Sequence, residues 1–366
     1  MKVNNKHYRT IWAEDKTIYL IDQNQLPFNF EILEITSLDA LCLAIKDMNI
    51  RGAGAIGAAA GYAMALGFLE ADPNYFLEQV NLAKKQIEAT RPTAQNLFGA
   101  VKRVYEIAIQ ANDAVKIAFE EAEKIALEDM AACQKIGEFG AALIQDGFGV
   151  ETHCNAGWLA FVDYGSALAP FYQAKRQGKQ FFVYVDETRP RNQGAKLTAW
   201  ELSNEEISHA IIADNAGAHY MSRGKINLMI VGADRIAANG DTANKIGTLE
   251  KAICAKAFGI PFYIAAPLAT IDLNCPNGSS IPIEERSQDE VLYQKGVGIS
   301  DLKKDVDPVG ATPCGCHECY IRVSNPTSSA LNPGFDVTPA EYITGLITEK
   351  GIIKPSFKSI QELFSK

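Results

Sequence analysis

The sequence predicts an α/β protein in which a mostly parallel, Rossmann-like sheet follows a smaller, mainly helical N-terminal region that starts with short strands. Three observations lead to this prediction. Residues 1–35 contain short β-rich strings, residues 37–143 carry apolar side chains at helical spacing, and residues 150–266 alternate apolar strands with helical segments. Such alternation is typical of a parallel sheet covered by helices. We expect two domains, residues 1–130 and 131–366, bridged by the long helix that ends near residue 144.

The composition is that of a globular enzyme. The chain has 366 residues, of which 47% are hydrophobic and 22% are charged. Residues 1–7 lack the apolar core of a signal peptide, and no stretch reaches the roughly 18 uninterrupted apolar residues of a membrane span. We therefore expect a cytoplasmic protein with no membrane partner. The formal net charge of −9 argues against nucleic-acid binding, although a few local cations suffice to hold one phosphate group.

The N-terminal region is expected to begin with strands over residues 17–22 and 28–35 and to become helical at Ser37, a residue type that suits an N-cap. Further helices are expected over residues 74–89, up to about residue 111, and over residues 113–143.

Two features of this helical region suit a phosphate group. Residues 51–57 read RGAGAIG and run into a helix of small residues, where the first backbone amides could hold an anion; close helix packing is the alternative. The match to GxGxxG does not indicate a dinucleotide site, because a helix rather than a strand precedes it. Pro92 disfavours helix at Arg91, whose guanidinium is then placed for a bidentate phosphate contact or a surface salt bridge.

The second half of the chain reads as successive strand–helix units. Strands are expected over residues 150–153, 181–185, 207–213, 226–231 and 261–266, and helices over residues 195–203, 216–221 and 245–258. Residues 273–330 break the pattern and are expected to form a long loop or a small subdomain. A capping box at residues 338–341 then predicts a helix that runs to about residue 350.

Polar residues follow several predicted strands at their carboxyl ends, which converge on one edge of a parallel sheet. They are Cys154, the 186–191 turn, Asp214 and Asp234. Asp234 is either an acid that acts on a small phosphorylated substrate or a brace for the loop after its strand. Cys154 is either a thiolate, favoured by a helix N-terminus and nearby cations, or a buried structural cysteine. Their shared position favours a chemical role for both.

The eight cysteines do not form a disulfide framework in a protein expected to be cytoplasmic. Cys314, Cys316 and Cys319 lie close together, and Cys275 lies upstream. These four could hold a structural zinc ion, although the CxCxxC spacing is not a standard zinc-knuckle pattern. A cluster of reduced cysteines and a redox pair are the alternatives.

Long strings along nearly the whole chain carry a family resemblance. They are RGAGAIGAAAGYA (51–63), TRPTAQNL (90–97), THCNAG (152–157), VDETRPRNQGAKLTAWEL (185–202), VGADRIAANGDTANKIGT (231–248), IPIEER (281–286) and FDVTPAEYITGLITEKGI (335–352). Through them the chain resembles the methylthioribose-1-phosphate isomerase family, within the wider group of proteins like the translation initiation factor 2B regulatory subunits. The segment that carries Cys314, Cys316 and Cys319 departs from the family, which has a shorter connection there.

The resemblance implies a function and a site. The implied reaction converts 5-methylthioribose 1-phosphate to 5-methylthioribulose 1-phosphate in methionine salvage, by a homodimer that needs no cofactor. The implied proton donor is Asp234, the implied catalytic cysteine is Cys154, and the residues implied to bind substrate are Arg51, Gly52, Ala53, Arg91, Gln193, Asn244 and Lys245. The alternatives are an isomerase for 5-deoxyribose 1-phosphate or ribose 1,5-bisphosphate, and a non-catalytic regulatory subunit.

Overall fold

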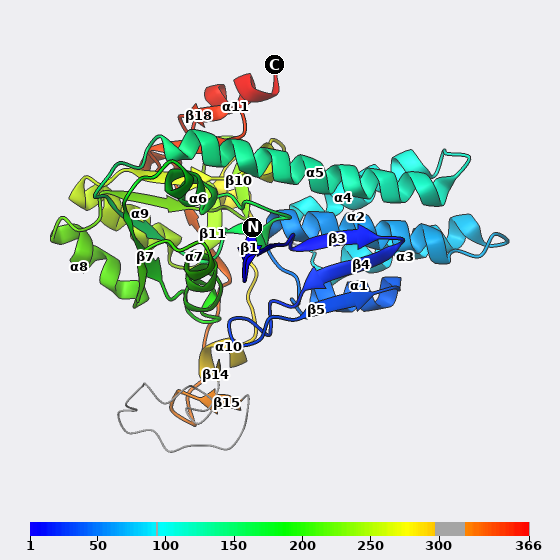
Figure 1. Ribbon diagram of the computed structural model, residues 1–366, viewed down its shortest axis with the longest axis horizontal. Coiled ribbons are helices and arrows are strands. Elements are labelled where there is room, and N and C mark those ends of the chain that lie inside the picture. Colours follow the sequence, from blue (N-terminus) through cyan, green and yellow to red (C-terminus); the bar gives the residue numbers. More distant parts are fainter. Residues whose placement is uncertain (93, 297–318, 366) are drawn as a thin grey trace.

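The computed structural model describes residues 1–92, 94–296 and 319–365, without the side chain of Cys319. Figure 1 shows a helical region at one end of the molecule and a sheet-based region at the other, with α5 (Ala114–Ala141) running along both. The α/β fold class predicted from the sequence is confirmed. The division into residues 1–130 and 131–366 stays a proposal, and its boundary falls inside α5.

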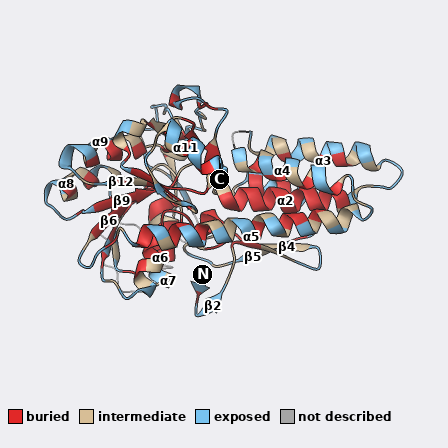
Figure 2. Ribbon diagram, turned by 90° about the horizontal axis from the view of Figure 1, so that it is seen from above, coloured by how far each residue is buried: buried red, intermediate tan, exposed pale blue. Residues whose placement is uncertain are grey.

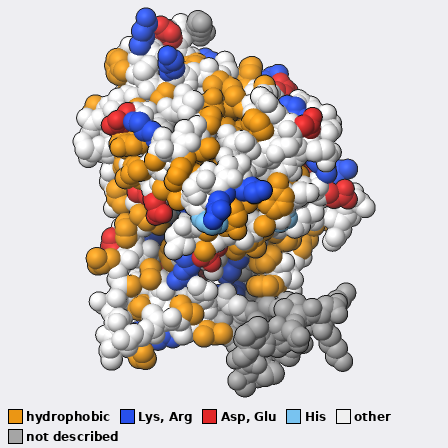
Figure 3. Space-filling view, turned by 90° about the vertical axis from the view of Figure 1, so that its left-hand side faces the viewer, with side chains coloured by type: hydrophobic (Ala, Val, Ile, Leu, Met, Phe, Trp, Pro, Cys, Tyr) orange, Lys and Arg blue, Asp and Glu red, His pale blue; other side chains and the backbone are white. Residues whose placement is uncertain are grey.

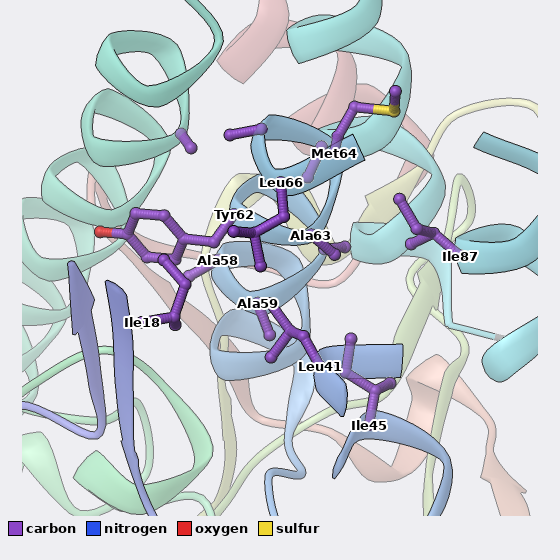
Figure 4. Packing of buried hydrophobic residues seen from close by; sticks show 14 of the residues in the cluster. Ile18, Leu41, Ile45, Ala58, Ala59, Tyr62, Ala63, Met64, Leu66 and Ile87 are labelled. Carbon is purple, nitrogen blue, oxygen red and sulfur yellow. The ribbon is translucent and has the colours of Figure 1, made fainter. Parts of the chain in front are cut away.

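The helical region is built around α2 (Ala53–Glu70), in which every residue from Gly54 to Phe68 is buried. Figure 2 shows this helix lying among its neighbours, and Figure 4 shows its side chains packed with Ile18, Leu41 and Ile87. Within the described residues α2 is long and apolar enough to cross a membrane, but 83% of it is buried inside the protein, as in a core helix. The surrounding elements are β1 (Lys2–Val3), β2 (Lys6–His7), β3 (Ile11–Glu14), β4 (Thr17–Ile21), β5 (Ile32–Ile35), α1 (Leu38–Lys46), α3 (Phe76–Thr90) and α4 (Gln95–Ala108).

A seven-stranded sheet forms the second region, in the order β18-β17-β12-β9-β6-β7-β8. All neighbouring strands are parallel except β17 and β18, which are antiparallel. The strands are β6 (Gly149–Thr152), β7 (Phe182–Asp186), β8 (His209–Ile212), β9 (Leu228–Val231), β12 (Phe262–Ala265), β17 (Gly345–Thr348) and β18 (Gly351–Ile353). The helices are α6 (Ala169–Arg176), α7 (Ala199–Asn204), α8 (Gly217–Ser222), α9 (Thr248–Phe258) and α11 (Phe357–Phe364).

Alternate residues of β9 face two separate hydrophobic cores. Leu228 and Ile230 pack in a cluster with side chains of α5, α6 and α7. Met229 and Val231 pack in another cluster with side chains of α8, α9 and α11. Because successive side chains of a strand point to opposite faces, helices cover both faces of this sheet, as in a doubly wound fold.

A smaller four-stranded sheet, in the order β13-β10-β11-β16, lies after the carboxyl end of β9. Its strands are β10 (Arg235–Ala237), β11 (Thr242–Lys245), β13 (Ile271–Asp272) and β16 (Phe335–Thr338). The described part of residues 273–330 includes α10 (Asp289–Leu292) and a hairpin of β14 (Tyr293–Gly296) and β15 (Cys319–Arg322), which projects from the body of the protein in Figure 1.

One helix prediction is wrong, and another helix starts later than predicted. The capping box at Thr338 starts no α-helix, because a 3₁₀ turn over Ala340–Tyr342 leads into β17, which is buried beside β12. A short apolar run does not distinguish a buried strand from a buried helix. The helix predicted over residues 245–258 is present, but it starts at Thr248, because Asn244 and Lys245 end β11.

Candidate active site

The carboxyl ends of four adjacent strands bring the predicted polar residues together. Strands β9, β6, β7 and β8 are neighbours in the sheet, and they lead to Asp234, Cys154, the 186–191 turn and Asp214. A pocket with an empty volume of about 1230 Å³, part of it open to solvent, lies at this edge. The residues predicted to act in catalysis or binding all line this pocket, namely Arg51, Gly52, Ala53, Arg91, Cys154, Gln193, Asp234, Asn244 and Lys245.

Asp234 stands between the main sheet and the smaller sheet. Its backbone N–H donates to the carbonyl of Ala243 at 2.9 Å, so β11 fixes its position. The carboxyl is accessible from the pocket, and the pocket walls surround it. This burial within the walls raises the pKa of Asp234, and the charges of Lys245, Arg51 and Arg91 oppose the rise. The carboxyl is therefore shifted toward the neutral form, which can donate a proton.

Cys154 follows β6 in a left-handed backbone conformation, with φ of 64°. Such a conformation costs on the order of 1 kcal/mol for a residue with a side chain, and strain of this kind concentrates at functional sites. Two threonines hold it in place. The Cys154 N–H donates to Thr188 Oγ1 at 2.8 Å, and the Thr198 hydroxyl donates to the Cys154 carbonyl at 2.7 Å.

The expectation of a helix N-terminus beside Cys154 is wrong. Only a 3₁₀ turn over Trp158–Ala160 follows it. Burial raises the pKa of the Cys154 thiol, while Arg51 and Lys245 oppose the rise. The free protein therefore holds this group mainly as a thiol, and the charges of Arg51 and Lys245 favour the thiolate.

Arg51 is held at the pocket by Asn155. Its Nη1 donates to Asn155 Oδ1 at 2.8 Å, and its Nη2 donates to the Asn155 carbonyl at 2.7 Å. Asn155 Nδ2 in turn donates to the buried Glu201 Oε1 at 2.8 Å. The next residue, Gly52, has φ of 95°, and a Cβ there would lie 2.3 Å from the Cα of Ala160, so a side chain does not fit. Since α2 begins one residue later, its first amides are placed at the pocket.

Further cations line the pocket. Lys245 Nζ donates to the Gly334 carbonyl at 2.8 Å, and burial lowers the pKa of Lys245. Arg286 and Arg191 both pair with Glu290, at 2.6 and 3.3 Å. Burial alone would raise the pKa of Glu290, but the hydrogen bond from Arg286 and the charges of both arginines hold it at about 2.

Two polar side-chain atoms at the pocket have no hydrogen-bond partner among the described residues. Nη1 of Arg91 is buried and has no hydrogen-bond partner in the described part of the chain. The same holds for Oε1 of Gln193. By contrast, Asn244 Nδ2 donates to Thr248 Oγ1 at 3.0 Å. Because a buried polar group without a partner costs stability, Arg91 and Gln193 are suited to bind a polar substrate.

Sequence reasoning missed Asn155, Arg191, Arg286 and Glu290 as part of this site. Asn155, Arg191 and Arg286 lie inside strings that had already been singled out, THCNAG, the turn after β7, and IPIEER. Their position in those strings was the signal by which the sequence could have assigned them to the site. The link between Arg191 and Glu290 joins residues 99 positions apart, and no local pattern reports such a contact.

The zinc hypothesis stays a prediction. Cys275 is buried and its thiol donates to the Asn277 carbonyl at 3.4 Å. Cys314, Cys316 and the side chain of Cys319 lie outside the described residues.

Among the described residues, His153, Asp186 and Asp214 bring ligand-type atoms close enough for one metal ion. These atoms already have partners. The Lys251 ammonium lies 3.2 Å from Asp186 Oδ1, and two backbone amides of the turn after β7 donate to the Asp214 carboxylate at 2.7 Å. We therefore assign no metal to this group.

The fold and the pocket define an α/β protein of the Rossmann-like class, with a small-molecule site at the carboxyl edge of its sheet. More narrowly, the chain belongs to the Initiation factor 2 subunit family, whose sequence model matches residues 49–355.

The chain is also similar to named proteins. The chain is 46% identical over 363 residues to the methylthioribose-1-phosphate isomerase of Roseiflexus castenholzii, with 96% of each chain covered. The crystal structure of 5-methylthioribose 1-phosphate isomerase from Pyrococcus horikoshii OT3 matches with a TM-score of 0.84 and 39% identity, covering 98% of this chain and 96% of that chain. The translation initiation factor eIF-2B, subunit delta, from A. fulgidus matches with a TM-score of 0.82 and 37% identity, covering 98% of this chain and 100% of that chain.

Proposed function

We propose that this protein is a sugar-phosphate aldose–ketose isomerase that converts 5-methylthioribose 1-phosphate to 5-methylthioribulose 1-phosphate, a step of methionine salvage. The observation that carries the proposal is the meeting of Asp234 and Cys154 in one pocket rich in guanidinium groups. The similar proteins from R. castenholzii and P. horikoshii carry this activity in their names, which supports the assignment.

The reaction must open a furanose ring whose anomeric oxygen carries phosphate. In our proposal Asp234 gives its proton to the ring oxygen as the bond from that oxygen to C1 breaks, and its raised pKa favours the protonated state that this step needs. Cys154, as thiolate, removes the proton from C2 to form an enol phosphate. That proton returns to C1, and the C2 hydroxyl becomes the ketone as it gives its own proton to the Asp234 carboxylate, which restores the acid. No cofactor takes part.

A hydride shift is the second candidate for the transfer between C2 and C1. The raised pKa of the Cys154 thiol favours it, because a thiol is a poor base. In this route hydrogen moves with its electron pair from C2 to the electron-deficient C1. The C2 hydroxyl gives its proton to the Asp234 carboxylate, and Cys154 only shapes the pocket.

The substrate's phosphate is assigned to Arg51, Arg91 and the first amides of α2 beyond Gly52 and Ala53. Guanidinium groups and helix N-termini both suit phosphate oxygens, and Arg91 has an unpaired donor. The sugar hydroxyls are assigned to three further residues that offer amide or ammonium groups at the pocket, Gln193, Asn244 and Lys245.

The pocket also favours an apolar group at C5 over a second phosphate. Apolar residues form part of its wall, among them Ile56, Phe161 and Ile283. Glu290 neutralises much of the charge of Arg191 and Arg286, which leaves less cation for a second phosphate. Isomerases for 5-deoxyribose 1-phosphate or ribose 1,5-bisphosphate are therefore the weaker alternatives.

The test is an NMR screen of products from three 1-phosphorylated pentoses that carry methylthio, hydrogen or phosphate at C5. We expect the methylthio sugar to become the ketose with the highest kcat/KM. Preferred conversion of the bisphosphate would overturn the substrate assignment. Absence of ketose from all three would favour the alternative that the protein is a regulatory subunit. The similarity to the A. fulgidus protein supports that alternative.

We further propose that the protein is a cytoplasmic homodimer that binds neither nucleic acid nor membrane. Exposed apolar side chains lie on β7, β8 and α9, namely Phe182, Ile211, Ile253 and Phe258. Figure 3 shows apolar side chains spread over this end of the molecule. Such a surface suits contact with a second copy, and the net charge of −9 disfavours nucleic acid. Light scattering of the purified protein should give the mass of two chains.

A further inference from the structure

His153, the residue before Cys154, is 1% exposed and has two partners. Its Nδ1 lies 2.9 Å from Asp186 Oδ2, at the end of β7. Its Nε2 lies 2.9 Å from the backbone carbonyl of Ile246, the residue after Lys245. One imidazole ring thus connects the ends of three strands that border the pocket, β6, β7 and β11.

Both partners of the ring are acceptors. A carboxylate and a backbone carbonyl carry no hydrogen to donate, whereas a neutral imidazole has one N–H and one bare nitrogen. A neutral His153 would therefore set a lone pair against an acceptor oxygen at hydrogen-bond distance inside a buried site. With Asp186 ionised, only the imidazolium ion, with a proton on each nitrogen, satisfies both contacts.

The surrounding charges agree with a cation at this position. Acidic side chains that act on the ring come from several elements: Asp186 on β7, Asp214 after β8 and Asp336 on β16. Lys251 on α9 is the other cation here, and it pairs with Asp186 and with Glu151 on β6. Burial alone would lower the pKa of His153, but the hydrogen bond and charge of Asp186 raise it overall, with help from Asp214. Burial and the charge of Asp186 also raise the pKa of Glu151.

The position of the ring also excludes a cysteine–histidine pair. Nε2 is committed to Ile246, and in the described part of the chain no hydrogen bond joins the imidazole to the Cys154 thiol. His153 therefore does not act as a base for Cys154. The contact between the ring and the Ile246 carbonyl instead fixes the position of the loop after Asn244 and Lys245. This loop packs directly on the imidazole, because a Cβ at Gly247 would lie 3.2 Å from the ring.

We propose that His153 is a positioning residue, held as an imidazolium ion, that ties the Cys154 end of β6 to the Asn244–Lys245 end of β11. The thiol and the substrate-binding pair then keep a fixed separation across the pocket. The kinetic part of this inference rests on the proposed isomerase function, and the protonation state of the ring does not.

The first test is NMR of the intact protein labelled with ¹⁵N-histidine, with the His153 signals identified by their loss in His153→Gln. We expect both ring nitrogens of His153 to carry protons at pH 7.5, where an unperturbed histidine is mostly neutral. A single protonated nitrogen at His153 would overturn the proposal, whether or not the protein is an isomerase.

The second test is kinetic. His153→Gln keeps an amide donor but no charge, and we expect kcat to fall at least about 10-fold with a rise in KM, since small misplacement of reacting groups is costly. Asp186→Asn removes the counter-charge, so the pH at which the His153 ring loses its second proton, followed by the same NMR signals, should move lower. His219→Gln is the matched control and should match the parent. Unchanged kcat and KM in His153→Gln would refute the positioning role.

Discussion

The Lys245 ammonium donates to the carbonyl of Gly334 at 2.8 Å. Lys245 lies on β11, which pairs with β10, the strand that follows Asp234. Within the described residues, no hydrogen bond or ion pair joins the side chains of Lys245 and Asp234. Lys245 nevertheless opposes the rise in the pKa of Asp234, and Asp234 opposes the fall in the pKa of Lys245. Burial is the largest influence on both groups, so the acid is shifted toward its neutral form despite a nearby cation.

Replacement of the proposed acid tests the centre of the mechanism. Asp234→Asn keeps the shape of the side chain but removes its acidic proton, so kcat should fall by at least about 10²-fold, the usual scale of general acid catalysis. Steady-state kinetics with the methylthio sugar measures this. Asp113→Asn, at the N-cap of α5 and outside the pocket lining, is the control and should keep full activity. Near-normal kcat in Asp234→Asn would refute the assignment.

The pH dependence should report the raised pKa of Asp234. Because the acid must be protonated, kcat/KM should decline as pH rises through that pKa. Lys245→Met removes a charge that opposes the rise, so the decline should move to higher pH while KM increases. Lys256→Met changes an exposed lysine on α9 and should leave the profile unmoved. A shift to lower pH in Lys245→Met would contradict this electrostatic account.

Cys154 decides between the two routes of hydrogen transfer. If it is the base, Cys154→Ala should lose at least about 10²-fold in kcat, and product formed in D₂O should carry deuterium at C1. Cys254→Ala, on α9, should match the parent. Little loss of kcat together with no solvent deuterium in the product would replace the enolate route by the hydride shift.

Arg91 should act on binding rather than on chemistry. Its buried, unpaired Nη1 is available to the substrate's phosphate, and a hydrogen bond to a charged group contributes about 1.5–3 kcal/mol. Arg91→Ala should therefore raise KM by at least about 10-fold with a smaller change in kcat. Arg223→Ala, an exposed residue that ends α8, is the control. A fall in kcat at unchanged KM would mean that Arg91 contacts only the transition state.

The sequence predicted the location of the site better than its internal contacts. Asp234 and Cys154 could be found because both follow apolar parallel strands, and strand order alone brings such residues to one edge. The link from Arg51 through Asn155 to Glu201 could not be found, because it depends on where α7 packs. Tertiary contacts also decided the helix errors: the residues after Thr338 join the sheet because β12 offers them a buried edge.

Buried carboxyl groups should make the protein more stable in mild acid than in mild base. Burial raises the pKa of Asp129 and Glu201 to about 7, and burial and Asp186 raise that of Glu151 to about 8. The folded state thus binds more protons than the unfolded state between about pH 4.5 and 8, and stability falls as pH rises wherever this is so. Glu290, with its pKa of about 2, adds a constant amount to the free energy of unfolding above about pH 5, because it is ionised in both the folded and the unfolded state there.

Thermal unfolding should therefore give a lower Tm at pH 8 than at pH 5.5. Asp129→Asn should flatten this slope, because it removes one titrating group while the side-chain oxygen can still accept the hydrogen bond from the Val162 amide, at 2.8 Å in the parent. Glu128→Gln, the exposed neighbour on α5, should lower Tm at both pH values and keep the slope, since it loses only its contact with Arg103. A Tm that rises from pH 5.5 to 8 would show that the buried carboxyls are ionised in the folded protein.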